Sequence, residues 1–357
     1  MRLKTKRLVL LLAGLVLSGL ALAFFARRLA GHWSEVAAAL GRADLAWLAV
    51  GVCILVVLYY FRVARWRLFL GHIQPVRGLS ATSATCIGFM ANNILPWRLG
   101  EFVRSYVLHR RERVVFGHAL ATVGLARVFD LIGLSILLLV TWIMMAWCSP
   151  VADAAGDLMR KVWQGGLILV LMAAAGSCVL VGLAVWPAPL LRTGEACSRL
   201  LPAAWRGPAN GFLRSVAKAM GFVRGRGDVA LAVGLSAGVW LAQGASTYAL
   251  ARALGLGIGL AGSFLAVVAV AVAVALPQAP GYLGTFHLAA ALTAEAFQAG
   301  TADAGAFAML MWLVDVVPVT LVGLGFLWYE GLSLRRLVAA SSTRQGDAEV
   351  GGATDGQ

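Results

Sequence analysis

One stretch of the sequence gathers the residue types that suit anion binding in an apolar environment. In chain order, its polar, charged and turn-forming residues are Asn92, Asn93, Pro96, Arg98, Gly100, Glu101 and Arg104. Asparagine amides can satisfy backbone groups where a helix breaks, and proline and glycine permit the turn. Arg98 and Arg104 can hold a phosphate through paired hydrogen bonds, with Glu101 orienting either guanidinium. Arg104 has a second interpretation, because a long arginine can reach lipid headgroups at the membrane surface.

Ionisable residues inside other apolar runs extend this candidate binding set. Arg127 and Asp130 are three residues apart, which places them on one helix face. They are interpreted either as an anion-contacting arginine oriented by its aspartate or as a structural ion pair between helices. Asp315 has no basic neighbour in its own run, so we expect it to meet a basic group from another helix, Arg98 or Arg127.

A histidine and a glutamate in a later apolar run are candidates for proton coupling. His287 and Glu295 are eight residues apart, about two helical turns. Histidine changes charge near neutral pH, so His287 has a switch as one interpretation. A packed histidine in the protein core is the favoured alternative.

The sequence has no complete catalytic constellation. It contains no nucleotide-binding loop, no HExxH, no nucleophile elbow and no repeated acidic DxxD site. The five cysteines are scattered, without the Cys or Cys/His spacing of a metal site. We therefore expect no metal, no cofactor and no catalytic residues, although enzymatic activity stays open.

The composition identifies the class of protein. Of 357 residues, 61% are hydrophobic and only 13% are charged, whereas soluble domains are about 45–50% apolar. Mean hydropathy is +0.84. These values exclude a soluble enzyme, a disordered chain and a secreted disulfide scaffold. The net charge of +14 indicates the cationic cytoplasmic rim of a membrane protein rather than nucleic-acid binding.

Apolar runs predict an all-α polytopic membrane protein with about seven or eight transmembrane helices. The runs are 8–26, 45–61, 119–147, 167–186, 229–251, 260–276, 283–299 and 304–328. The first is interpreted as a signal anchor rather than a cleaved signal peptide, because it is long and further spans follow. A shorter run, 81–95, ends at the Asn-Asn and proline break.

The distribution of Lys and Arg predicts the orientation. With both termini in the cytoplasm, most of the 30 Lys and Arg residues lie on the inner side. Basic clusters flank the run 81–95 on both sides, so we expect this run to be re-entrant and to line a cavity. The connection 187–228 predicts a basic amphipathic helix on the cytoplasmic leaflet, with a solvated connector as the equal alternative. The tail 340–357 predicts cytoplasmic disorder.

An internal repeat is a further hypothesis. Residues 95–101 and 279–285 both place Leu-Gly three residues after a proline, and an aspartate follows each proline by 34 residues (Asp130) or 35 residues (Asp315). The hinge candidates are Pro96, Gly100, Pro277, Pro280, Gly281 and Gly284. If 283–299 re-enters rather than crosses, the units 45–147 and 229–328 are inverted copies, an arrangement typical of transporters. Coincidence among common residues is the alternative.

These motifs resemble a known family. Residues 92–104 resemble the "NNLLP-x-R-x-GE-x-x-R" motif of the flippase-like transmembrane domain of lysylphosphatidylglycerol synthase/flippases. Residues 127–130 are similar to its "ER-x-x-D" helix, and 277–286 to its second "P-x-x-PG" break. The resemblance covers about residues 5–335. Ala126 and His287 stand where the family often has glutamate, and no segment here matches the soluble aminoacyl-transferase domain of bifunctional members.

The resemblance implies a flippase-like domain at 1–339 in a bacterial-type cytoplasmic (inner) membrane. The first hypothesis is a translocator of an anionic lipid or lipid-linked precursor, whose headgroup contacts the polar residues named above. The alternatives are a non-catalytic partner of envelope lipid or glycan synthesis and an intramembrane lipid-modifying transferase. Expected partners are membrane lipids with anionic headgroups and envelope biosynthesis proteins, without nucleic acid. The cargo, its direction, the coupling ion and the oligomeric state stay open.

Overall fold

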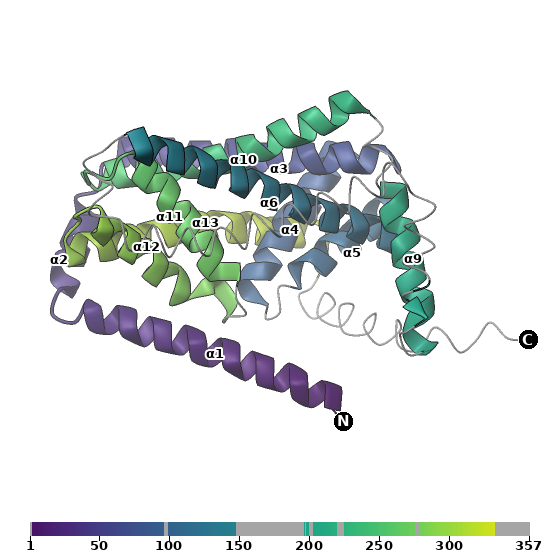
Figure 1. Cartoon of the computed structure of the whole chain (residues 1–357), viewed down its shortest axis with the longest axis horizontal. Coiled ribbons are helices and arrows are strands. Elements are labelled where there is room, and N and C mark those ends of the chain that lie inside the picture. The colour runs from purple at the N-terminus through teal and green to yellow at the C-terminus, as the bar shows by residue number, and fades with distance from the viewer. Residues whose placement is uncertain are drawn as a thin grey trace, which may run out of the picture.

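The computed structural model describes residues 2–95, 99–147, 196, 198–199, 203–219, 225–275 and 279–332. Every regular element in these residues is a helix (Figure 1). In chain order they are α1 (Arg2–Arg28), α2 (Trp33–Gly41), α3 (Leu45–Gly71), α4 (Gly78–Ile94), α5 (Gly100–Glu112), α6 (Phe116–Trp147), α9 (Ala203–Ala219), α10 (Arg226–Ala253), α11 (Leu260–Ala275), η4 (Pro280–Tyr282), α12 (Thr285–Ala296) and α13 (Thr301–Tyr329).

Four helices in the described residues are long and apolar enough to cross a membrane, namely α3, α6, α10 and α13. A fifth span results if α1 and α2, bent by 87° at the break between them, count as one. The predicted runs 260–276 and 283–299 form the short helices α11 and α12, and 167–186 lies outside the described residues. The all-helical, multi-pass class is confirmed, while the higher span count stays a prediction.

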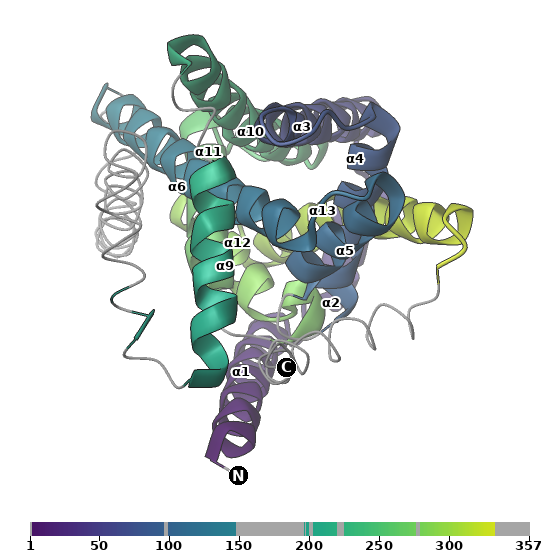
Figure 2. The same ribbon diagram turned by 90° about the vertical axis from the view of Figure 1, so that its right-hand side faces the viewer.

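The long helices α3 and α10 lie side by side (Figures 1 and 2). Gly51 permits this approach, because a Cβ atom there would lie only 3.1 Å from the Leu250 side chain. The Ser246 hydroxyl donates to the Gly51 carbonyl at 2.9 Å, a polar link that adds to the packing of two membrane helices. These two helices, with α6, form one wall of the cavity described below.

The first chain break separates α4 from α5, and the two helices pack antiparallel to each other. Gly88 on α4 faces α5, because a Cβ there would meet the Arg104 Cβ at 2.9 Å and the Gly100 carbonyl at 3.0 Å. The Asn92 side-chain oxygen accepts from the Gly100 amide at 2.9 Å. As expected from the sequence, this asparagine satisfies a backbone group that the break leaves without a helical partner. Pro96 and Arg98 lie outside the described residues.

The second break separates α11 from α12, and this pair also packs antiparallel. Gly262 near the start of α11 faces Phe297 at the end of α12, because a Cβ on this glycine would lie 2.9 Å from the phenyl ring. Gly281 and Gly284 have φ angles of +72° and +90°, which favour glycine. A side chain at Gly284 would also collide with the α1 backbone, 2.7 Å from the Leu22 nitrogen. Both glycines lie at the break, their role as hinges stays a prediction, and Pro277 lies outside the described residues.

The order long helix, broken pair, long helix occurs twice, in α3–α6 and in α10–α13. The inverted relation of these units and the re-entrant path of the broken pairs stay predictions. Within 187–228, the described helix α9 packs against α6, with exposed Arg206, Arg214 and Lys218. Its contact with a membrane surface is likewise untested, and the tail 340–357 lies outside the described residues.

Candidate functional site

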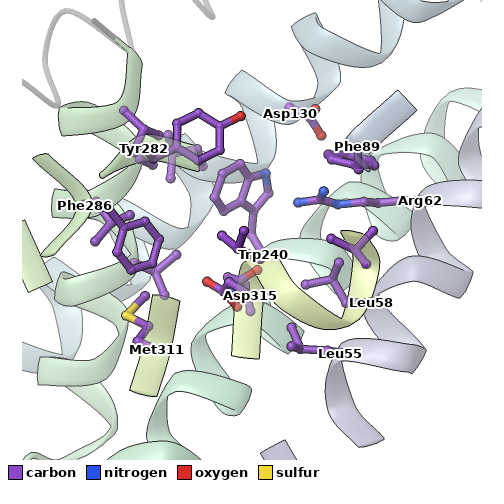
Figure 3. A pocket seen from close by; sticks show the side chains of 18 of the residues that line it. Leu55, Leu58, Arg62, Phe89, Asp130, Trp240, Tyr282, Phe286, Met311 and Asp315 are labelled. Carbon is purple, nitrogen blue, oxygen red and sulfur yellow. The ribbon is translucent and has the colours of Figure 1, made fainter. Parts of the chain in front are cut away.

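A cavity of about 370 Å³ lies between the long helices α3, α6, α10 and α13 and the elements next to the two chain breaks, α4, α11, η4 and α12. Side chains from α3, α4, α6, α10, α11, η4, α12 and α13 line it (Figure 3). Most of the lining is aliphatic or aromatic. Its polar and charged members are Tyr59, Arg62, Asn93, Arg127, Asp130, Gln243, Tyr282 and Asp315.

The two chain breaks meet beside this cavity, and α13 holds both of them. The Trp312 indole nitrogen donates to the Gly281 carbonyl at 2.7 Å. The Asn93 amide nitrogen donates to the Thr320 hydroxyl at 2.9 Å. A Cβ on Gly281 would lie 3.7 Å from the Asn93 carbonyl oxygen, so the breaks are in direct contact. Asn93 and Gly281 thus come together from positions 188 residues apart.

The second break also carries backbone strain at the cavity wall. Tyr282 lines the cavity and has a φ angle of +59°, which costs a non-glycine residue about 1–2 kcal/mol. Such strain persists only where the surrounding structure fixes the backbone, and it gathers at functional sites. Apart from the position of Tyr282 between two glycines, nothing in the sequence indicates that this residue belongs to the site.

Four charged residues form a linked network at one end of the cavity, here called the four-residue network. Asp130 accepts from Arg65 Nη2 at 2.5 Å and from Arg127 Nη1 at 3.2 Å. Arg127 Nε donates to Glu101 Oε1 at 2.7 Å, and Arg65 Nη1 donates to the Ser236 hydroxyl at 2.8 Å. The predicted pair of Arg127 and Asp130 is therefore present, and it joins α3, α5 and α6. Arg127 still has 42% of its side chain exposed and lines the cavity.

Two further arginines adjoin this network without a carboxylate partner among the described residues. Arg62 lines the cavity, with its guanidinium 4.6 Å from the centre of the Phe89 ring. Arg104 is buried, and its guanidinium lies 3.6 Å from the centre of the Trp66 ring. Arg104 is thus placed against an aromatic core residue, which does not match its alternative interpretation as a surface headgroup contact.

The opposite part of the cavity is acidic. Asp315 accepts two hydrogen bonds from Gln243 Nε2, at 3.0 and 3.1 Å. No basic side chain of the described residues, Arg127 included, lies within ion-pairing distance of it. The expected pairing with Arg127 is therefore wrong, because Arg127 forms ion pairs with Glu101 and Asp130 instead. Arg98, the other expected partner, lies outside the described residues.

The two candidates for proton coupling lie apart from the cavity and from each other. The His287 ring is buried, with centroids 5.3 Å from Phe25 and 5.5 Å from Trp312. Glu295 forms an ion pair of 2.6 Å with Arg28 of α1. His287 is thus a packed core residue, and Glu295 forms an ion pair that connects α12 to α1.

Several residues of the site are absent from the set predicted from the sequence. Arg62 and Arg65 follow the predicted apolar run 45–61 and belong to the basic cluster before the run 81–95, which is predicted to be cytoplasmic, but α3 continues to Gly71. Their spacing of three residues was an available signal, because it places both on one helix face. Gln243 is a neutral amide within an apolar run and gave no charge signal. No group of three or more metal-binding side chains occurs in the part of the chain that the structure describes.

The arrangement can bind an amphiphile, because charged groups and apolar walls share one cavity. Comparison with known proteins now identifies the family. The family described as "Lysylphosphatidylglycerol synthase TM region" matches residues 11–323. The chain belongs to this family. It is therefore a multi-pass membrane protein, as the four long apolar helices of the described residues also indicate.

A named protein also matches part of the chain. Glycosyltransferase AglD of Haloferax volcanii is 33% identical over 164 residues, which cover 45% of this chain. The match spans only 26% of that relative's length. No solved structure matches the chain.

Proposed function

We propose that this family member moves an anionic lipid, or a lipid-linked precursor, across the membrane in which it lies. The observation that carries the proposal is the cavity where both chain breaks meet, with arginines at one end and apolar walls. Paired helix breaks around a polar cavity are the arrangement in which transporters bind and expose cargo. The headgroup would bind near Arg62 and Arg127, while the lipid tails stay in the bilayer.

The size of the cavity supports a headgroup as the bound part. Small-molecule pockets are roughly 300–1,000 Å³, and the cavity of about 370 Å³ is at the lower end of that range. Two long acyl chains need far more space. In this mechanism the broken pairs α4/α5 and α11/α12 change position against the long helices and expose the headgroup to alternate sides. The described residues hold no nucleotide-binding motif, so a gradient of an ion or of the lipid itself would drive the movement.

A role as a membrane partner in lipid or glycan synthesis is the second candidate. The observation in its favour is the similarity to a glycosyltransferase, which extends over about a quarter of that protein. A transferase reaction within this chain has less support. Glu101 and Asp130 are held in ion pairs with arginines, and His287 is packed in the core away from them, so none of the three is positioned as a free base.

The test is lipid translocation by purified protein in proteoliposomes, with labelled phosphatidylglycerol and labelled polyprenyl phosphate as separate cargoes. Val319→Trp fills the cavity, because Val319 lines it and is 5% exposed. Val322→Trp is the matched control, since this valine on the same helix is 49% exposed. We expect the wild type and Val322→Trp to accelerate transbilayer movement and a folded Val319→Trp protein to lose it. Equal rates in protein-free vesicles and wild-type vesicles, for both cargoes, would contradict the proposal and favour the partner role.

A further inference from the structure

The charges at the arginine end of the cavity do not balance. Within the four-residue network the two arginines, Arg65 and Arg127, are matched by the two carboxylates of Glu101 and Asp130. The network is therefore neutral as a unit. Arg62 and Arg104 add two positive charges beside it, and no carboxylate of the described residues pairs with either.

Arg104 is the buried member of this surplus, and it lies outside the cavity lining. Its side chain is buried, with 8% of the residue exposed, and its Nε and Nη2 atoms have no hydrogen-bond partner among the described residues. Contact with the Trp66 ring stabilises a cation only weakly compared with the cost of taking a charge out of water. Arg104 lies within electrostatic range of Arg62, Arg65 and Arg127, which repel it, and of the Asp130 carboxylate, which offsets part of that repulsion.

Arg62 is the cation of this group that a ligand can reach together with Arg127, because both line the cavity. Its guanidinium lies beside two aromatic rings that contact each other, 5.5 Å from the centre of Tyr59 and 4.6 Å from the centre of Phe89. In Figure 3, Arg62 and Asp130 extend into the same part of the cavity. The guanidinium of Arg62, which donates no hydrogen bond to a carboxylate of the described residues, is therefore available to a ligand next to the neutral network.

Asp315 is the remaining charged residue of the cavity lining, and it attracts Arg62 from beyond ion-pairing distance. Its carboxylate is bound by the Gln243 amide, and no arginine of the described residues lies within 4 Å of it. A ligand anion placed near Asp315 would be repelled, so the negative charge of a ligand has one favourable place. That place is the end formed by α3 and α6, beside Arg62 and Arg127.

We propose that this end of the cavity selects a phosphate monoester, which carries two negative charges, over a phosphodiester, which carries one. Two unpaired arginines beside a neutral network are matched in charge by a dianion. A terminal phosphate also offers three acceptor oxygens, enough to bind two guanidinium groups at once. The inference names the cargo class of the proposed function and rests on the same site. The favoured cargo is a lipid that ends in a free phosphate.

Equilibrium binding tests this selectivity without any transport step. Native mass spectrometry of the purified protein would compare phosphatidic acid, a monoester, with phosphatidylglycerol, a diester, on identical acyl chains. The second ionisation of a phosphate monoester has a pKa of about 6. We expect at least about tenfold tighter binding of phosphatidic acid at about pH 8. This preference should fall towards one at about pH 5. Phosphatidylglycerol does not titrate in this range, so its binding reports any change in the protein itself.

Variants of α3 assign the preference to Arg62. Arg62→Gln should remove most of the preference at the higher pH, and Arg62→Lys, which keeps the charge, should restore part of it. Arg67→Gln is the matched control, because this exposed arginine on the same helix is not part of the cavity lining. Equal binding of the two lipids by the wild type would overturn the inference. A preference that persists unchanged in Arg62→Gln would overturn it as well.

The two proposals fail in different ways. Selective binding of phosphatidic acid without translocation of any lipid would refute the transport function and leave the selectivity of the site intact. Translocation of phosphatidylglycerol and of polyprenyl phosphate at equal rates, with equal binding, would refute the selectivity and leave transport intact.

Discussion

Replacing Asp130 by asparagine tests whether one carboxylate neutralises the buried Arg65. The Arg65 side chain is only 3% exposed, and that of Asp130 is 19% exposed. Their contact of 2.5 Å is the ion pair of Arg65 in the described residues. Asparagine has nearly the same shape as aspartate, so the change removes the charge while it leaves the packing in place.

The expected cost follows from the burial of the arginine that remains. Removing one partner of a buried ion pair leaves an uncompensated charge and costs about 3–5 kcal/mol. Glu101→Gln is the comparison, because it also removes a carboxylate from the network. There the side chains of Glu101 and Arg127 are 31% and 42% exposed, and such accessible pairs contribute about 0–1 kcal/mol. We therefore expect Asp130→Asn to destabilise the protein by at least about 2 kcal/mol more than Glu101→Gln.

The assay is the free energy of unfolding, measured in mixed micelles by titration with sodium dodecyl sulfate and followed by circular dichroism and tryptophan fluorescence. Arg65→Met, made alone and in combination with Asp130→Asn, completes a double-mutant cycle. Because a buried pair can often be replaced by apolar residues at little cost, the double variant should recover much of the stability lost in Asp130→Asn. If Asp130→Asn costs no more than Glu101→Gln, or if the double variant recovers nothing, the reasoning about buried charge is wrong.

Three further expectations follow from the packing around the breaks. Gly100→Ala should lower the free energy of unfolding by about 1–3 kcal/mol, because a Cβ atom at this position would collide with α4. Gly124→Ala is the control, and the same assay should find no such loss because Gly124 has open space around it. Glu295→Gln should cost about 1 kcal/mol or less, because its pair with Arg28 is partly exposed; a loss above about 2 kcal/mol would contradict this. His287→Phe should keep or raise the melting temperature, because the buried ring packs against aromatic side chains and its Nδ1 has no partner in the described residues. For the same reason the pH dependence of translocation should stay unchanged. An altered pH profile would support the proton-coupling role instead.

The features of the fold and site that depend on neighbouring residues in the sequence could be predicted from the sequence. The helical membrane class follows from the long apolar runs. Asparagine, proline and glycine within such runs indicated both breaks, and Asn92 does satisfy the Gly100 amide. The spacing of Arg127 and Asp130 predicted their contact, because residues three apart on a helix are neighbours. Each of these features depends on a few residues that are close in the sequence.

Features that depend on which helices meet could not be predicted. The partner of Asp315 is Gln243, a residue 72 positions away with no charge to attract attention. Arg65 resembles an ordinary basic residue at the end of an apolar run, and only the position of α6 makes it the partner of Asp130. The hydropathy pattern predicts that the apolar run of α3 ends at residue 61, whereas the helix continues to Gly71. Charged residues can extend a helix beyond its apolar part when other helices supply partners for them.

The arrangement of α13 explains how a change at the breaks can reach the charges of the cavity. Trp312 binds the second break and Thr320 binds the first, and Asp315 lies between them on the same helix. An α-helix advances 1.5 Å per residue, so about 12 Å of one helix fixes the separation of the two breaks and the position of Asp315. The four-residue network is held instead by α3, α5 and α6. Asp315 and Arg62 thus lie on different helices, α13 and α3, so a movement of α13 against α3 changes the distance between them.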